Sequence, residues 1–255
     1  MVIFGIDILG DSQKRSEIAA KGVCGMKRNV KAVFFDAGET ILSVAKNRFE
    51  RIQEALSRRG FVVSIERIQE VDAKAMEILL GSGDSWISRP EQEERFWDAY
   101  YRMMVEGLNL GADLKTLARE LWDETYWVKW CFTYPDVLPV LKALKGRYKL
   151  GVISNAFPSM YEALDFTGLT PYMDSITISA EVGVSKPDPL IYEIALRSVG
   201  VKAEESIFVD NLKENTQAAA EMGFKAFLID RDGTQDGPEV IRSLYAVLDF
   251  LEIPR

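Results

Sequence analysis

Two kinds of hydrophobic pattern occur along this chain of 255 residues. Short apolar runs of four or five residues, bounded by charged or turn-forming residues, are typical of strands buried in a parallel sheet. Longer segments with apolar residues three or four positions apart are typical of helices that bury one face. The first pattern predicts strands at 32–35, 149–153, 175–178, 206–209 and 225–229.

The second pattern first predicts four helices in a row, with breaks rich in glycine or proline between them. These helices cover 48–59, 65–80, 91–105 and 113–130. After residue 134, the predicted strands alternate with helices at 190–199, 216–222 and 238–251. Such alternation implies a doubly wound parallel sheet with helices on both faces. We therefore predict an α/β fold in which an all-helical domain is inserted after the first strand.

The predicted elements divide the chain into three parts. Residues 30–45 and 134–255 form the predicted α/β core, and 46–133 form the helical insertion. Residues 1–29 do not fit either part and are interpreted as an N-terminal extension. The apolar run at 2–9 is not preceded by a positively charged segment, so it is a poor match to a secretory signal.

Composition excludes several classes of function. The net charge of −8 argues against nucleic acid as a partner, and no apolar run approaches the roughly 20 residues of a membrane span. The chain has no histidine, which removes Ser-His-Asp and Cys-His catalysis. Its two cysteines, Cys24 and Cys131, are expected to be reduced in a cytoplasmic protein. Carboxylate, lysine, hydroxyl groups and a hard metal ion remain for catalysis.

Polar residues follow the predicted strands at four separate places. They are Asp36, the pair Ser154 and Asn155, Lys186 in a loop stiffened by two prolines, and the pair Asp210 and Asn211. Ligands of open α/β sheets bind outside the carboxyl ends of the strands, so these residues are candidates for one site. A single carboxylate there is more often a turn residue or a helix cap, but four such positions in order favour chemistry.

These residues resemble the four motifs of the haloacid dehalogenase (HAD) superfamily. Asp36 with Thr40, then Ser154, then Lys186-Pro187 and finally Asp210 occur in the family's order. The resemblance covers roughly residues 30–230, and Lys186-Pro187-Asp188-Pro189 is characteristic of members with a helical cap between the first two motifs. It implies a Rossmann-like core, a mobile cap, Mg²⁺ as cofactor and an aspartyl enzyme intermediate.

The resemblance also implies roles for individual residues, in three groups. The catalytic residues are Asp36, Ser154 and Lys186. The residues expected to bind the phosphate are Ala37, Gly38, Thr40 and Asn155. The residues expected to hold Mg²⁺ are Asp36, Gly38 through its main-chain carbonyl, Asp210 and Asn211. The implied substrate is a small phosphorylated metabolite, bound by a monomer or a homodimer.

Two positions depart from the pattern of the family's phosphatases. Gly38 stands where those enzymes carry an aspartate that protonates the leaving group, and Asn211 stands where a second acidic residue is common. Glu39 could supply a carboxyl group, but neighbouring residues at a turn usually point apart. General acid catalysis contributes about 10²–10⁴-fold, so the change at Gly38 leaves alternatives open.

Three functions therefore remain possible. The favoured one is a Mg²⁺-dependent phosphatase that acts through an aspartyl-phosphate. A metal-independent 2-haloacid dehalogenase would not need the missing acid, but the carboxylate of Asp210 would repel its substrate. The third is a non-catalytic homologue that binds a phosphorylated ligand or a protein.

The insertion contains all five tryptophans, Trp86, Trp97, Trp122, Trp127 and Trp130. On the predicted helix 113–130, Trp122, Tyr126 and Trp130 would share one face. We favour the interpretation that these rings form the insertion's own core, with contact to the substrate as the alternative.

Overall fold

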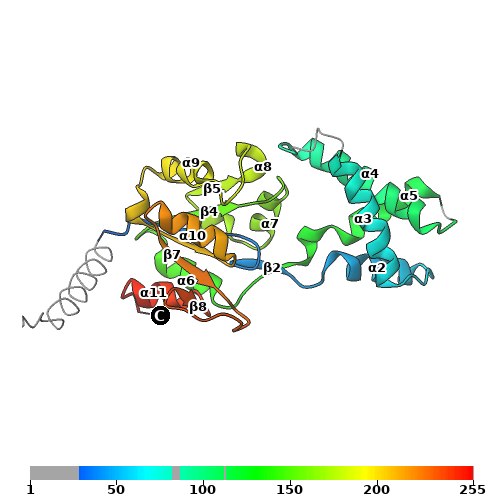
Figure 1. Cartoon of the computed structure of the whole chain (residues 1–255). Coiled ribbons are helices and arrows are strands. Elements are labelled where there is room, and N and C mark those ends of the chain that lie inside the picture. The colour runs from blue at the N-terminus through cyan, green and yellow to red at the C-terminus, as the bar shows by residue number, and fades with distance from the viewer. Residues whose placement is uncertain (1–28, 82–86, 112, 255) are drawn as a thin grey trace, which may run out of the picture.

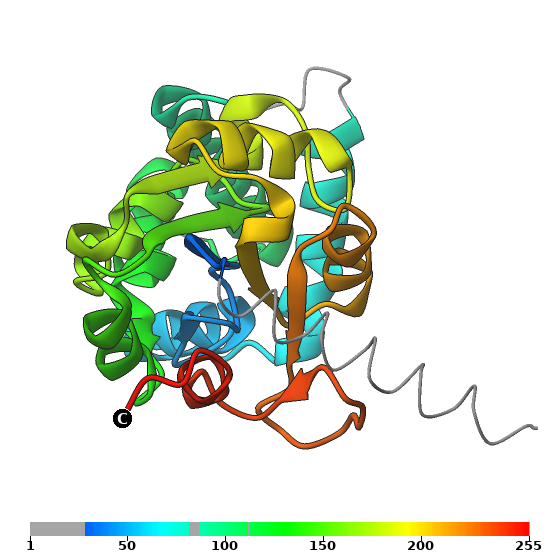
Figure 2. The same ribbon diagram turned by 90° about the vertical axis from the view of Figure 1, so that its left-hand side faces the viewer.

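The computed structural model describes residues 29–81, 87–111 and 113–254. The predicted N-terminal extension, apart from Asn29, lies outside these residues, as do Cys24 and Trp86. Figures 1 and 2 show a sheet with helices packed on both sides, and Figure 1 shows a group of helices displaced to one side of it.

The main sheet has six strands in the order β5-β4-β1-β6-β7-β8, and every neighbouring pair is parallel. Its strands are β1 (Ala32–Phe35), β4 (Lys149–Ser154), β5 (Ser175–Ile178), β6 (Ser206–Asp210), β7 (Lys225–Ile229) and β8 (Val240–Ile241). The strand order reverses at β1, because the chain continues first to one side of this strand and later to the other. This reversal is the place where α/β sheets bind their ligands.

The central strand β1 is buried on both faces, as its unbroken apolar sequence predicts. Val33 and Phe35 belong to one core cluster, while Ala32 and Phe34 belong to another on the opposite face. Gly151 in β4 leaves room for the ring of Phe34, since a Cβ there would lie 2.6 Å from a ring carbon. Each fully buried phenylalanine contributes about 1.5–3 kcal/mol to folding.

Helices cover both faces of this sheet (Figure 2). The cluster around Val33 and Phe35 includes residues of α6 (Val137–Leu144), α7 (Met160–Phe166) and α11 (Tyr245–Phe250). The opposite cluster includes residues of α9 (Pro189–Val199) and α10 (Lys213–Glu221). A short helix, α8 (Ser179–Val182), follows β5. Among the described residues, no helix is both long enough and apolar enough to cross a membrane.

The inserted segment forms a helical cap with its own hydrophobic core. Its helices are α2 (Arg48–Arg58), α3 (Ile65–Gly81), α4 (Pro90–Leu108) and α5 (Leu114–Thr125). Helix α2 begins after Asn47, whose side chain accepts hydrogen bonds from the main chain of Phe49 and Glu50, while Glu50 binds the Asn47 N–H in return. The cap is joined to the sheet by an antiparallel ribbon of β2 (Leu42–Val44) and β3 (Cys131–Thr133).

The prediction of one helix over 113–130 is wrong. Helix α5 ends at Thr125, Tyr126 has an extended ψ of 118°, and Trp127–Trp130 form a separate 3₁₀ turn, η1. The indole of Trp127 donates a hydrogen bond to Ser159 in the core, which turns the chain away from the α5 axis. The stripe of Trp122, Tyr126 and Trp130 therefore does not exist as one helix face.

The prediction of one helix over 238–251 is also wrong. Its first part contains the edge strand β8, which pairs with β7, and only Tyr245–Phe250 are α-helical. Main-chain bonds to the neighbouring strand outweigh the helical spacing of apolar residues in this segment.

Candidate active site

Three adjacent strands bring the predicted site residues to one edge of the sheet. Asp36 directly follows β1, and its main-chain N–H donates to the carbonyl of Val209 in β6 at 2.8 Å. Ser154 is the last residue of β4, and Asp210 is the last residue of β6. All three side chains are buried: Asp36 is 7% exposed, Ser154 2% and Asp210 0%. Their close placement follows from the parallel register of the strands.

The amine of Lys186 lies between the two carboxylates. Its Nζ donates to Oδ1 of Asp36 at 2.6 Å and to Oδ2 of Asp210 at 2.7 Å. The Lys186 side chain is 1% exposed and also lies over the ring of Phe208, with Nζ 5.5 Å from the ring centre. Charge-assisted bonds of this kind hold all three groups in fixed positions.

Asn155 binds the main chain of Lys186. Its amide nitrogen donates to the Lys186 carbonyl at 2.8 Å, and its Oδ1 accepts from the Lys186 N–H at 2.7 Å. The loop that carries the lysine is thus fixed to the end of β4. Both ends of the Asn155 side chain are occupied, so its geometry fits positioning of Lys186 better than direct contact with a phosphate.

Burial changes the acidity of Asp36. The pKa of this carboxyl is raised to about 6, chiefly because burial disfavours the charged form, and the negative charge of Asp210 raises it further. The ammonium of Lys186 acts in the opposite direction. Two buried carboxylates and one buried ammonium leave the cluster with an excess of negative charge, which favours binding of another cation.

The turn after Asp36 is built around the carbonyl of Ala37. This oxygen accepts from the main-chain N–H groups of Thr40, Ile41 and Leu42 at 3.3, 3.0 and 3.0 Å. Gly38 does not have a positive φ, and a Cβ built on it meets nothing within 4 Å. Position 38 therefore has both the space and the backbone conformation for a larger side chain.

Glu39 points away from the site. This residue has a φ of 58°, and its carboxylate accepts hydrogen bonds from the hydroxyls of Ser43 at 2.6 Å and Tyr134 at 2.7 Å. Its carboxyl group therefore does not replace the acid missing at Gly38. Thr40 is fully buried, and its Oγ1 has no hydrogen-bond partner among the described residues.

Asn215 belongs to the site but was not among the predicted residues. It lies in the first turn of α10, is 2% exposed, and donates from Nδ2 to Oδ2 of Asp210 at 3.0 Å. Its Oδ1 is buried without a partner in the described part of the chain. The available signal was its position five residues after Asp210, where the first turn of a helix can face back to the strand end. Asn211, by contrast, is half-buried.

Arg231 is a second residue that sequence reasoning missed. Its guanidinium donates to the carbonyl of Thr40 at 2.8 Å and to both carboxylate oxygens of Asp136 at 3.1 and 3.2 Å. It also lies over the ring of Tyr134, 3.8 Å from the centre. Arg231 thereby fixes the loop that follows Asp36. Its partners lie far away along the chain, so no local pattern could reveal this role.

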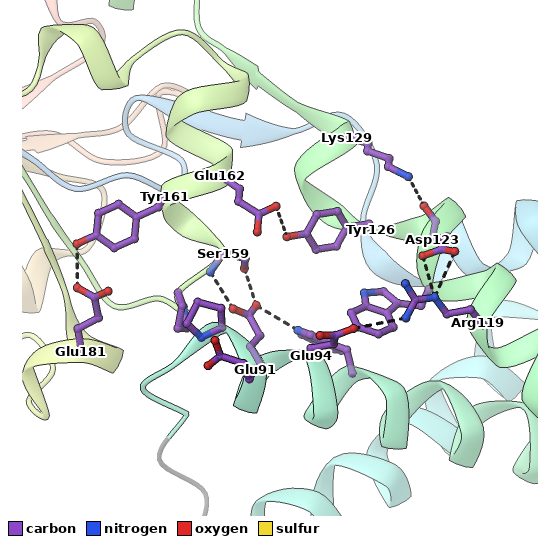
Figure 3. A pocket seen from close by; sticks show the side chains of 15 residues that line it. Glu91, Glu94, Arg119, Asp123, Tyr126, Lys129, Ser159, Tyr161, Glu162 and Glu181 are labelled. Carbon is purple, nitrogen blue, oxygen red and sulfur yellow. Dashed lines mark hydrogen bonds and ion pairs between the residues drawn. The ribbon is translucent and has the colours of Figure 1, made fainter.

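Two cavities lie near the junction of cap and core. One of about 360 Å³ is lined by Ile87 of the cap and by residues that follow β4 and β5, including Asn155 and Phe157. The other, of about 500 Å³, lies between α4, α5 and α7 and is shown in Figure 3. In it, Glu93 of α4 accepts from the N–H of Ser159 at 2.8 Å, from the Ser159 hydroxyl, and from the indole of Trp97 at 3.2 Å.

The comparisons with known proteins agree with this geometry. A family model described as haloacid dehalogenase-like hydrolase matches residues 30–223. The chain belongs to this family. The match begins just before β1 and ends just after α10, so it spans the cap and the site residues from Asp36 to Asn215, but not Arg231. The resemblance inferred from the four motifs is confirmed.

Individual relatives include phosphatases and dehalogenases. A glyceraldehyde 3-phosphate phosphatase of Methanopyrus kandleri is 28% identical over 214 residues, which are 81% of this chain and 87% of that protein. The crystal structure of a HAD phosphatase from Thermococcus onnurineus has a TM-score of 0.58 and 25% identity, and the alignment covers 89% of this chain and 100% of that one. A 2-haloacid dehalogenase from Pseudomonas syringae pv. Tomato DC3000 has a TM-score of 0.64 at 22% identity, covering 88% and 98%. The last similarity concerns the fold alone, and the predicted fold class is confirmed.

Proposed function

We propose that this HAD-family hydrolase is a Mg²⁺-dependent phosphatase that cleaves a small phosphomonoester through an aspartyl-phosphate on Asp36. The observation that carries the proposal is the pairing of Lys186 with both Asp36 and Asp210 at the edge of the sheet. A phosphatase needs positive charge beside its nucleophile, because phosphoryl transfer depends mainly on positioning and electrostatic stabilisation. Lys186 supplies one such charge, and the remaining excess of negative charge in the cluster favours a cation at the same place.

The donor set fits Mg²⁺. The carboxylates of Asp36 and Asp210 and the main-chain carbonyl of Gly38 offer hard oxygens of the kind that this ion prefers. The buried Oδ1 of Asn215 has no partner among the described residues. It adds another oxygen next to Asp210, and it would suit the ion or a water bound to it. Mg²⁺ at this place would offset the negative charge of the cluster and of the phosphate oxygens.

The chain's own residues divide the remaining work. Asp36 attacks phosphorus through a carboxylate oxygen, the bond from phosphorus to the ester oxygen breaks, and water later attacks phosphorus to release phosphate and free the carboxylate. Lys186 holds Asp36 in position and offsets charge between the nucleophile and the substrate. Ser154 and the main-chain N–H groups of the 37–38 turn would bind the transferring oxygens. Asn155 and Arg231 position these groups rather than react.

Protonation of the leaving group is the weak step of this site. Gly38 has no acid, and Glu39 is bound to Ser43 and Tyr134. We therefore propose that the natural substrate either has a leaving group that departs without a proton or carries its own proton donor. Aryl or acyl phosphates would then react faster than simple alkyl phosphates.

A 2-haloacid dehalogenase is the second candidate, and the glycine at position 38 favours it. Displacement of a halide needs neither a metal nor an acid. The buried carboxylate of Asp210 argues against it, because a second negative charge so close to Asp36 would repel a halo-carboxylate.

The domain boundaries, the location in the cell and the oligomeric state are further proposals. We propose that 46–133 act as a cap over the core formed by 30–45 and 134–255, and that the protein is a cytoplasmic monomer or homodimer. The separate hydrophobic clusters support the division into two parts, although Val128 and Cys131, near the end of 46–133, pack in the cluster of the α/β core.

The decisive test is a panel of small phosphomonoesters and 2-haloacids, assayed with Mg²⁺ and with a chelator. Release of phosphate that needs Mg²⁺ and is lost in Asp36→Asn is the expected result. Halide release in the presence of chelator would support the dehalogenase instead. Phosphate release that survives in Asp36→Asn would overturn the proposed nucleophile, and no turnover of any compound would favour a non-catalytic role.

A further inference from the structure

The helical cap contains a buried guanidinium without a counter-charge of its own. Arg51 of α2 is only 6% exposed, and its Nε and Nη1 have no hydrogen-bond partner in the described part of the chain. The nearby carboxylate of Asp72 is already engaged, since it binds Nη2 of Arg48 at 2.6 Å and the hydroxyl of Tyr100 at 2.7 Å. Buried charges in proteins are normally paired, so the environment of Arg51 is incomplete.

Arg48 and Arg51 both line a small cavity. It has a volume of about 30 Å³ and is lined by both arginines together with aromatic side chains and one threonine. The lining residues are Arg48, Arg51, Trp97, Tyr101, Trp122, Thr125, Tyr126 and Trp127. The Nε of Arg48 is likewise buried without a partner among the described residues, so three donor nitrogens on the two guanidinium groups are unused there. A cavity needs roughly 10–15 Å³ of such space to hold one water, so this cavity has room for a water or a monatomic ion.

The charge balance favours an anion over a water. Asp72 pairs with Arg48, whereas the groups that act most strongly on Arg51 are Tyr101, Arg48, Cys131 and Tyr100, none of which is a carboxylate. Burial raises the pKa of the Tyr101 hydroxyl, and it raises the pKa of the Cys131 thiol to about 11. Both groups are therefore neutral at physiological pH and do not balance the second arginine.

The small cavity adjoins a larger groove. The small cavity shares Trp97, Trp122 and Tyr126 with the groove of about 500 Å³ between cap and core. Most carboxylates along that groove already have partners: Glu94 and Asp123 pair with Arg119, and Glu93 binds Ser159 and Trp97 (Figure 3). We propose that this cavity is an anion-binding site, in which Arg51 and Arg48 hold one monovalent ion the size of chloride. The site is separate from the catalytic cluster and does not depend on the proposed phosphatase activity.

Two measurements on the full chain test the site. Crystals of the wild-type protein grown or soaked in sodium bromide should show an anomalous peak for bromide between Arg51 and Arg48. Replacing 100 mM sodium gluconate by 100 mM sodium chloride should raise the melting temperature by about 3 °C for a dissociation constant near 10 mM, because gluconate is a much larger anion than chloride.

The matched variants are Arg51→Gln and Arg102→Gln. Both remove one arginine from the cap, but Arg102 is exposed and pairs with Asp98 on α4. The shift with chloride should disappear in Arg51→Gln and persist in Arg102→Gln. The proposal is overturned by a chloride shift of equal size in both variants. It is equally overturned if bromide crystals show only a water in the cavity, a result that does not depend on whether Arg51→Gln folds.

Discussion

At the scale of single residues, the charges around Asp36 lead to a prediction about its acidity. Asp210→Asn removes the carboxylate that raises the pKa of Asp36 and leaves Lys186 to pair with Asp36 alone. The pKa of Asp36 should therefore fall below about 6. A carboxyl group is charged above its pKa, so a larger fraction of Asp36 will be ionised at pH 5 in the variant.

Carboxyl carbon NMR of the metal-free protein measures this change, with Asp36→Asn identifying the resonance. Since burial is the larger cause of the raised pKa, the value should remain above that of an exposed aspartate. An unchanged or higher pKa in Asp210→Asn would contradict the arrangement of charges seen here.

A second prediction at this scale concerns Gly38. Because its φ is not positive and a Cβ meets nothing within 4 Å, Gly38→Asp should fold without strain. If the missing acid limits the reaction, the variant should hydrolyse alkyl phosphates faster, by at most the about 10²–10⁴-fold of general acid catalysis. Aryl phosphates should change little, since their leaving groups need no proton.

Gly38→Asn is the matched control, because asparagine has the same shape as aspartate and no acidic proton. The comparison of kcat for alkyl and aryl phosphates across the three proteins is the measurement. Equal rates in Gly38→Asp and Gly38→Asn would show that another group donates the proton or that the reaction needs none.

Sequence reasoning located residues that follow strands and missed residues that act from elsewhere. The positions of Asp36, Ser154 and Asp210 at strand ends could be predicted because buried strands have a clear apolar pattern, while the roles of these residues stay predictions. Asn215 was missed because α10 begins at Lys213, three residues before the predicted start, which places Asn215 in the first helical turn rather than in a loop.

At the scale of elements, local periodicity predicted helices well where the cap buries its own surface. The helices expected at 48–59 and 65–80 are observed as α2 (Arg48–Arg58) and α3 (Ile65–Gly81). It failed where contacts from distant parts of the chain decide the conformation. The strand β2 precedes the cap in the sequence and β3 follows it, so their pairing joins distant segments. Each strand has only three residues, too few for an alternating pattern that would predict it.

The contact of α4 with the start of α7 gives a prediction at this scale. Glu93 is 4% exposed and accepts hydrogen bonds from Ser159 and Trp97. Glu93→Ala would leave these donors buried without a partner, which costs about 1–3 kcal/mol for each such group. We expect the free energy of unfolding in urea to fall by about 2–4 kcal/mol, with some donors regaining water.

Glu94→Ala is the matched control, because it lies next in the sequence and its side chain is 60% exposed, in a weak pair with Arg119. Its unfolding free energy should change by less than about 0.5 kcal/mol. If the two variants are equally stable, the contact between α4 and α7 does not hold the cap in this position.

At the scale of the whole molecule, the fold class and the family were predictable, because four motifs separated by a long helical stretch constrain the topology strongly. The sheet order places β1 between β4 and β6, so segments more than a hundred residues apart meet at one edge. The relation between cap and core was not predictable from the sequence. It depends on single contacts, such as that of Trp127 with Ser159, that no periodic pattern encodes.

Binding of Mg²⁺ should be visible in the stability of the whole molecule. A ligand that binds only the folded protein stabilises it by RT ln(1 + [L]/Kd), so Mg²⁺ at one hundred times its dissociation constant adds about 2.7 kcal/mol. For a chain of this size, the melting temperature should rise by several degrees. Asp210→Asn should lose most of this rise, because it removes one of the two buried carboxylates at the site.

Asp230→Asn is the matched control. It makes the same substitution just after the neighbouring strand β7, where the carboxylate pairs with Arg242 instead. Because Asp230→Asn weakens that pair, the comparison uses the increase produced by Mg²⁺ in each protein and not the melting temperature itself. An increase in Asp210→Asn as large as in the wild type would place the metal elsewhere, whatever the activity of the enzyme.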